Sequence, residues 1–155
     1  MIGVDLAKRV FHLHVATMTG YVKDRKKLTR EQFRRYMADH PKCVVVFEAC
    51  GSAHYWSREM ICLGHDARMI PLRPFVKRHK NDRNDAEAIV VVAQRPEMRF
   101  VAPKTEEQQA RAVMFRSRER LVHQRTDLVN ALRSVLYEFG HVFPSGIGHV
   151  KKSRL

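Results

Sequence analysis

Hydrophobic residues in the first part of the chain recur with a period of two. Segments 2–7 (IGVDLA) and 11–17 (FHLHVAT) alternate apolar and polar positions, which predicts two β-strands. In the second of them, one face would carry Phe11, Leu13 and Val15. Segment 20–28 (GYVKDRKKL) begins with a turn glycine and predicts a third, more exposed strand. The three strands would form a meander with short turns.

The pattern then changes to a period of about 3.6 residues. Residues 29–40 predict a helix with Thr29 as N-cap and Gln32 at the capping-box position. Segment 42–49 (KCVVVFEA) is a continuous β-branched run that ends in an acid. Such a run is typical of a strand that is buried on both faces and whose carboxyl end opens onto a site.

A second helix and a further strand follow. Residues 52–64 predict a helix capped by Ser52 and ended by Gly64, and residues 67–70 predict a short strand. Three sequential strands followed by alternating helices and strands predict an α/β fold, with a mixed sheet flanked by helices.

The second half of the chain is mostly helical in pattern. Residues 84–94 predict a helix, and residues 105–139 predict a much longer one without internal glycine or proline. Apolar residues repeat every seven positions along the longer helix, at Met114, Leu121, Leu128 and Val135. This pattern fits both packing against the sheet and coiled-coil pairing with a second chain. The remaining 140–155 segment is a basic, loop-like tail.

Composition adds a strong charge to this picture. The 155 residues contain 29 Lys and Arg against 16 Asp and Glu, a formal net charge of +13. Such an excess is most simply relieved by a polyanion, and nucleic acid is the first candidate, although a packing protein of ribosomal or chromatin type would share the charge. Cys43, Cys50 and Cys62 form no CxxC pair, so neither a disulfide framework nor a zinc knuckle is supported. With no signal peptide and no apolar run long enough to cross a bilayer, we expect no membrane association and a cytoplasmic location.

Four acidic residues stand out against this basic background. Asp5 lies within an apolar strand, where an ionised carboxylate is costly unless it is paired or binds a metal, although an edge strand could expose it to water. Glu48 ends the buried run, where it could cap a loop or serve a site. Asp82 and Asp85 lie three residues apart at a predicted helix start, where N-capping is the alternative role. The four would converge if the first and fourth strands are neighbours.

Four convergent carboxylates need cations to neutralise their repulsion. Oxygen ligands without a Cys/His cluster favour Mg²⁺ or Mn²⁺, and two such ions roughly 4 Å apart would clamp a phosphodiester. Phosphate contacts are expected from the adjacent basic residues, Arg73, Lys77, Arg78, Lys80 and Arg83. His12 and His14 alternate on one strand face and are interpreted as structural. The cluster His54, Tyr55 and Trp56 could stack on a base or pack a helix onto the sheet.

Three segments carry a resemblance to a known family: GVDLAK at 3–8, FEACGSAHYW at 47–56 and KNDRNDAEAI at 80–89. The chain resembles the N-terminal RuvC-like domain of IS110-family transposases, of the IS1111 branch. The resemblance implies an RNase H-like fold, a bacterial host, divalent metal, and DNA recombination guided by a structured RNA. The family's DEDD set falls on Asp5, Glu48, Asp82 and Asp85.

The resemblance also implies a second domain with a serine that resembles the nucleophile of serine recombinases, and the chain stops at Leu155, before any such domain. We therefore expect a catalytic core at 1–103, a long helix at 104–139 that packs or pairs into a homo-oligomer, and a tail at 140–155 leading to a missing C-terminal domain. The expected function is the catalytic N-terminal part of an RNA-guided DNA transposase. The alternatives are a Holliday-junction-resolvase-like nuclease and a non-catalytic, dimerising nucleic-acid-binding fragment.

Overall fold

The computed structural model describes residues 1–17, 19, 21–71, 82–144, 146 and 148, and for residues 82–85 it describes the backbone alone. Contacts within the chain divide it into two compact units, Met1–Thr105 and Glu106–Leu155. The first unit is an α/β unit built on one sheet, and the second begins with a long helix.

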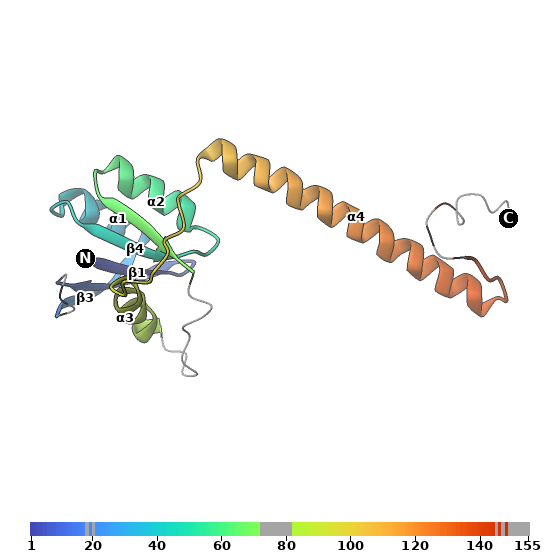
Figure 1. Ribbon diagram of the computed structural model, residues 1–155, viewed down its shortest axis with the longest axis horizontal. Coiled ribbons are helices and arrows are strands. Elements are labelled where there is room, and N and C mark those ends of the chain that lie inside the picture. Colours follow the sequence, from blue (N-terminus) through green and yellow to red (C-terminus); the bar gives the residue numbers. More distant parts are fainter. Residues whose placement is uncertain (18, 20, 72–81, 145, 147, 149–155) are drawn as a thin grey trace. The chain divides into compact units, whose positions relative to one another are not determined.

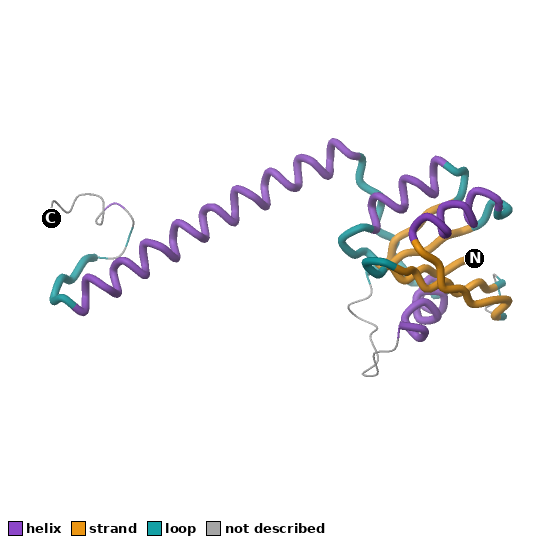
Figure 2. The backbone as a smooth tube through the Cα atoms, turned by 180° about the vertical axis from the view of Figure 1, so that it is seen from behind, coloured by secondary structure: helices purple, strands orange, loops and turns teal. Residues whose placement is uncertain are grey.

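The first unit contains a five-stranded mixed sheet in the order β3-β2-β1-β4-β5 (Figures 1 and 2). β1 pairs antiparallel with β2, and β2 with β3, whereas β1 and β4, and β4 and β5, are parallel. The strands are β1 (Ile2–Leu6), β2 (Val10–Ala16), β3 (Val22–Thr29), β4 (Val44–Glu48) and β5 (Asp66–Ile70). This topology confirms the predicted meander and the mixed sheet of an RNase H-like fold. It also meets the condition for the acids to converge, because the first and fourth strands are neighbours.

Three helices cover the two faces of this sheet. The helices are α1 (Arg30–Asp39), α2 (Ala53–Cys62) and α3 (Asp82–Ala93). α1 and α2 lie on one face, where their side chains join the larger hydrophobic core, and α3 lies on the other (Figure 1). The sheet is therefore the middle layer of three, as expected when both faces of its central strands are apolar.

The two short helices on the same face start in different ways. Thr29 and Gln32 form the predicted capping box. The backbone N–H of Gln32 donates to Thr29 Oγ1 at 3.3 Å, and the backbone N–H of Thr29 donates to Gln32 Oε1 at 2.9 Å. Ser52 occupies the N-cap position of α2, but its backbone is near the helical region (φ −107°, ψ 0°) and its side chain makes no cap hydrogen bond. The predicted capping by Ser52 is therefore wrong, because a capping hydroxyl needs an extended backbone at that position.

Aromatic side chains fill the core between the sheet and the α1–α2 layer. Phe33 of α1 packs edge-on against Phe11, Phe47 and Trp56, with ring centroids 5.3 to 6.5 Å apart. Trp56 is only 4% exposed. Of the two roles considered for the aromatic cluster in α2, Trp56 has the packing role.

A smaller core lies between the sheet and α3. Its buried members are Val46, Ile70, Ile89, Val92 and Ala93. α3 approaches β1 closely at Gly3, because a Cβ built on this residue would lie 2.6 Å from the Ala86 carbonyl oxygen and 2.6 Å from Val90 Cγ2. Glycine is thus needed at position 3 for helix and strand to pack together.

We expect Gly3→Ala to destabilise the fold by about 1–3 kcal/mol, because the added methyl group must displace α3 or β1. Urea denaturation followed by circular dichroism measures this loss. Gly51→Ala is the matched control, since a Cβ at Gly51 meets no atom within 4 Å, and its effect should stay within about 0.5 kcal/mol. Equal stability of the two variants would contradict the close approach of α3 to β1.

The second unit begins with α4 (Glu106–Glu138), which confirms the predicted long helix. All of α4 is described, and none of its residues is buried. Its heptad residues are each more than half exposed: Met114, Leu121, Leu128 and Val135. Within the described residues, no helix combines the length and apolar character needed to span a membrane.

Candidate functional site

Asp5 lies on the face of the sheet that α3 covers. Side chains alternate along a strand, so Asp5 shares this face with Gly3, whereas Ile2 and Val4 belong to the core on the other face. Asp5 is half-buried near the carboxyl end of β1. A half-buried carboxylate on a central strand is costly unless its environment supplies compensating positive charge.

Glu48 occupies the matching position on β4. The parallel register pairs Ile2 with Val45 and Val4 with Phe47, and the same offset of 43, continued by one residue, places Glu48 level with Asp5. Val46 packs against α3, and Glu48 follows two positions later on the same face. Glu48 is also half-buried. Two acids from distant segments are therefore neighbours on adjacent strands.

The direction of α3 relates the remaining two acids to this pair. Ala86 lies over Gly3, whereas Val92 and Ala93 pack in the core that also includes Val44, the first residue of β4. α3 therefore runs antiparallel to β1 and β4, and its amino end is directed toward the carboxyl ends of these strands. Asp82 and Asp85 belong to the first turn of α3, and their side chains lie outside the described part of the chain.

The donor chemistry of the described acids suits a hard cation. Asp5 and Glu48 offer carboxylate oxygens, which Mg²⁺ and Mn²⁺ prefer. Among side chains that the structure describes, no group of three or more His, Cys, Asp or Glu is arranged to hold a metal. A complete site would therefore need the acids of the α3 first turn, whose backbone partial charges also favour negative groups there.

The predicted phosphate-binding residues are not tested by the structure. Arg73, Lys77, Arg78 and Lys80 lie outside the described residues, and so does the side chain of Arg83. Their role stays a prediction.

The strand register also reveals two residues near Asp5 that were not predicted to serve the site. His12 on β2 pairs with Asp5, and Lys27 on β3 pairs with His12. Cross-strand partners point to the same face, so Lys27, His12, Asp5 and Glu48 form a row across four strands, named here the cross-sheet row. The alternation of His12 with His14 was the available sequence signal, but only the register connects His12 to the acid.

Comparison with known proteins identifies the family to which these features belong. Residues 2–141 match the model of the IS110 family of DEDD transposases, which is described as "Transposase". The matched span includes Asp5, Glu48, Asp82 and Asp85. The chain belongs to the IS110 transposase family. This finding confirms the resemblance inferred from the motifs.

Several curated proteins are similar to this IS110-family chain over most of its length. A probable family 20 transposase of Pseudomonas aeruginosa is 49% identical over 142 residues, which cover 90% of this chain and 42% of that protein. The transposase for insertion sequence element IS1328 of Yersinia enterocolitica is 41% identical over 155 residues, covering 98% of this chain and 46% of the relative.

The transposase for insertion sequence element IS1111A of Coxiella burnetii is 40% identical over 149 residues, covering 94% of this chain and 41% of the relative. The chain thus spans less than half the length of these relatives. No solved structure matches it.

Proposed function

We propose that this chain is the catalytic N-terminal part of an RNA-guided DNA transposase that acts on DNA phosphodiesters with divalent metal. The observation that carries the proposal is the side-by-side position of Asp5 and Glu48 on one face of adjacent parallel strands. Membership of the IS110 transposase family supports the reaction class.

In this proposal Asp5, Glu48, Asp82 and Asp85 hold the metal. When bound, two Mg²⁺ or Mn²⁺ ions would polarise a scissile phosphate and stabilise negative charge on the attacking and leaving oxygens. The two strand acids would orient the site from a rigid sheet, since both belong to hydrogen-bonded strands. The acids of α3 would complete it from the opposite layer.

The proposed partners are DNA and a structured guide RNA. The formal charge of +13 supports polyanion binding, because each Lys or Arg that neutralises a phosphate releases counterions. The basic residues at positions 73–83 would hold phosphates on either side of the metal-bound one.

We also propose that α4 pairs with a second copy of the chain. Its heptad residues Met114, Leu121, Leu128 and Val135 are spaced as in a coiled-coil seam. Their exposure in the single chain leaves an apolar stripe available for a partner. A second copy carries the same stripe and is therefore complementary to it.

Removal of divalent metal tests the proposed site. We expect the affinity of the chain for a fluorescent four-way DNA junction to fall about tenfold when EDTA replaces Ca²⁺ at constant ionic strength, because removing the cation lowers the positive charge that attracts phosphate to the acids. Fluorescence anisotropy measures this affinity, and Ca²⁺ stands in for Mg²⁺ without promoting cleavage.

Two other outcomes would identify the alternative functions. Equal affinity with and without metal would indicate a non-catalytic nucleic-acid-binding module. Nicking of the junction by this chain after addition of Mg²⁺ would indicate a nuclease of Holliday-junction-resolvase type, in which no second domain is needed.

A further inference from the structure

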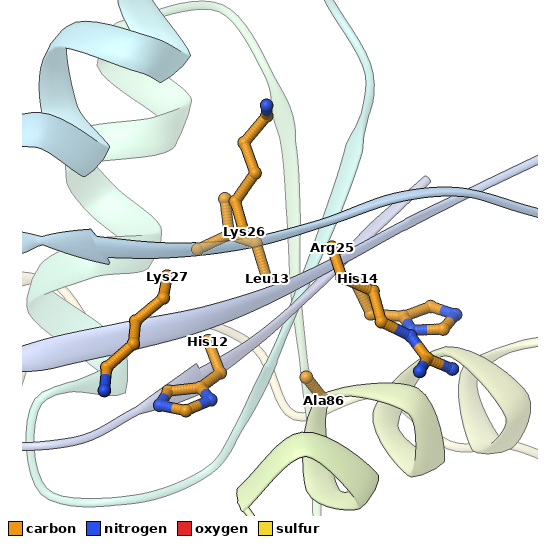
Figure 3. Close-up of a pocket in the computed structure, with 7 residues that line it drawn as sticks. All are labelled: His12, Leu13, His14, Arg25, Lys26, Lys27 and Ala86. Carbon is orange, nitrogen blue, oxygen red and sulfur yellow. The ribbon is translucent and has the colours of Figure 1, made fainter.

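A cavity of about 310 Å³ lies on the α3 face of the sheet, beside the cross-sheet row. It is lined by His12 and His14 of β2, Arg25 and Lys27 of β3, and Ala86 of α3 (Figure 3). Leu13 and Lys26 also border it, but their side chains point away from α3 in Figure 3. Every polar side chain that lines the cavity from the α3 side of these two strands is a nitrogen base.

These bases form two cross-strand pairs. His12 is opposite Lys27, and His14 is opposite Arg25, as the antiparallel register of β2 and β3 requires. Figure 3 shows both histidine rings and the Lys27 and Arg25 side chains extending to the α3 side of the sheet. The first pair is the one that adjoins Asp5.

The hydrogen-bonding capacity of the cavity is only partly used. Arg25 Nη2 lies 2.7 Å from Glu87 Oε2, whereas Lys27 and His12 make no hydrogen bond or ion pair within the described part of the chain. His14 is 2% exposed, and its Nδ1 has no hydrogen-bond partner among the described residues. An unpaired buried nitrogen is costly, so a ligand oxygen entering the cavity would offset that cost.

The charge of the cavity determines the sign of its ligand. Arg25 and Lys27 are positive and Glu87 pairs with Arg25, so the lining carries a net positive charge. Burial lowers the pKa of His14, so this ring adds a neutral hydrogen-bonding group. Two permanent cations would repel a metal ion, and a mixture of cations and N–H donors suits a phosphate.

We propose that this cavity binds a backbone phosphate of the DNA strand whose neighbouring phosphate lies at the Asp5–Glu48 site. The assignment rests on the proposed function, because it takes the acids as the place where DNA is held. Lys27 and His12 would contact the phosphate oxygens directly, and the buried His14 would offer its unpaired Nδ1 to them. The exposed Arg25, which pairs with Glu87, would add positive charge at the edge of the cavity.

The spacing of the row agrees with a single DNA strand. Neighbouring β-strands lie about 4.8 Å apart, so Lys27 on β3 is roughly 10 Å from Asp5 on β1 along the sheet. A strand of B-form DNA carries one phosphate per about 3.4 Å of helix axis. The path between successive phosphates is longer than this rise, because the strand winds around the axis, so the row spans roughly one to two phosphate steps. A phosphate next to the one at the acids can therefore reach the Lys27 side chain.

Lys27→Gln tests the assignment, because it removes the charge from an exposed side chain without altering the core. We expect about fivefold weaker binding of the chain to a Ca²⁺-loaded four-way DNA junction, and a salt dependence reduced by about one counterion. Lys23→Gln is the matched control, since Lys23 is an exposed lysine on the same strand, about 13 Å away, and does not line the cavity. Its affinity should stay within about twofold of the wild type.

A neutral methylphosphonate placed at successive backbone positions identifies the phosphate. At one position it should weaken wild-type binding about fivefold and leave Lys27→Gln binding unchanged. The proposal would be overturned if Lys27→Gln and Lys23→Gln lose DNA affinity equally. It would also be overturned if every methylphosphonate position weakens the wild type and Lys27→Gln to the same extent. Asp5→Asn and EDTA test the metal site independently of Lys27. If EDTA lowers DNA affinity as expected but Lys27→Gln binds DNA as the wild type does, the phosphate cavity is rejected and the metal site is not.

Two further results would also overturn the assignment to DNA. The cavity would be assigned to a free anion if calorimetry shows that Lys27→Gln loses binding of inorganic phosphate while its affinity for DNA stays unchanged. A loss confined to binding of structured RNA, with DNA affinity unchanged, would assign it to the guide.

Discussion

Asp5→Asn should weaken Mn²⁺ binding by at least about 100-fold. Loss of an outer-shell partner already costs roughly 10- to 100-fold in metal affinity, and a direct carboxylate ligand contributes charge as well as geometry. Asparagine keeps the size of the side chain, so the pairing of β1 with β2 and β4 should persist. Isothermal titration calorimetry with Mn²⁺ measures the affinity, and circular dichroism checks the fold.

The control for this change is Asp39→Asn, which removes the same charge from an exposed position at the end of α1. Its Mn²⁺ affinity should equal that of the wild type. If both variants bind Mn²⁺ as the unaltered chain does, Asp5 is not a ligand, and the proposed catalytic role of the acids fails with it. Unchanged DNA binding in Asp5→Asn would then favour a non-catalytic binding module.

The double change Leu121→Glu and Leu128→Glu should abolish self-association of the chain. Both leucines lie on the heptad stripe of α4, and burying unpaired carboxylates in a coiled-coil seam costs at least about 3 kcal/mol, or roughly 100-fold in affinity. Sedimentation equilibrium measures the change from dimer to monomer.

The opposite face of α4 supplies the control. His123→Glu and Asn130→Glu add the same two charges, at positions that an α-helix of about 3.6 residues per turn turns away from the stripe. These variants should remain dimeric. A monomeric wild-type chain, or equal loss of association in both double variants, would contradict pairing through the stripe.

Local interactions made much of the fold predictable from the sequence. The alternation around Phe11 predicted β2, since adjacent side chains of a strand must face opposite sides. The Thr29–Gln32 box predicted the start of α1, because both hydrogen bonds join residues three apart. Ser52 shows the limit of this reasoning: its residue type suits a cap, but its backbone angles do not.

The neighbourhood of the acids depended on contacts between distant segments. The period of two placed Asp5 and Gly3 on one face, but the β1–β4 register was needed to bring Glu48 level with Asp5. The close approach of Ala86 to Gly3 in turn orients α3. The metal-binding roles of Asp5, Glu48, Asp82 and Asp85 stay predictions.

By itself, the sequence determined the charge, the number and type of most elements, the family motifs and the acids that could bind metal, because these follow from residue type and short-range periodicity. The side chains that lie beside these acids followed from strand pairing and helix packing instead. His12 lies beside Asp5, and Lys27 lies beside His12, because hydrogen bonding between strands sets a single register. Register is a property of strand pairing that no single segment contains.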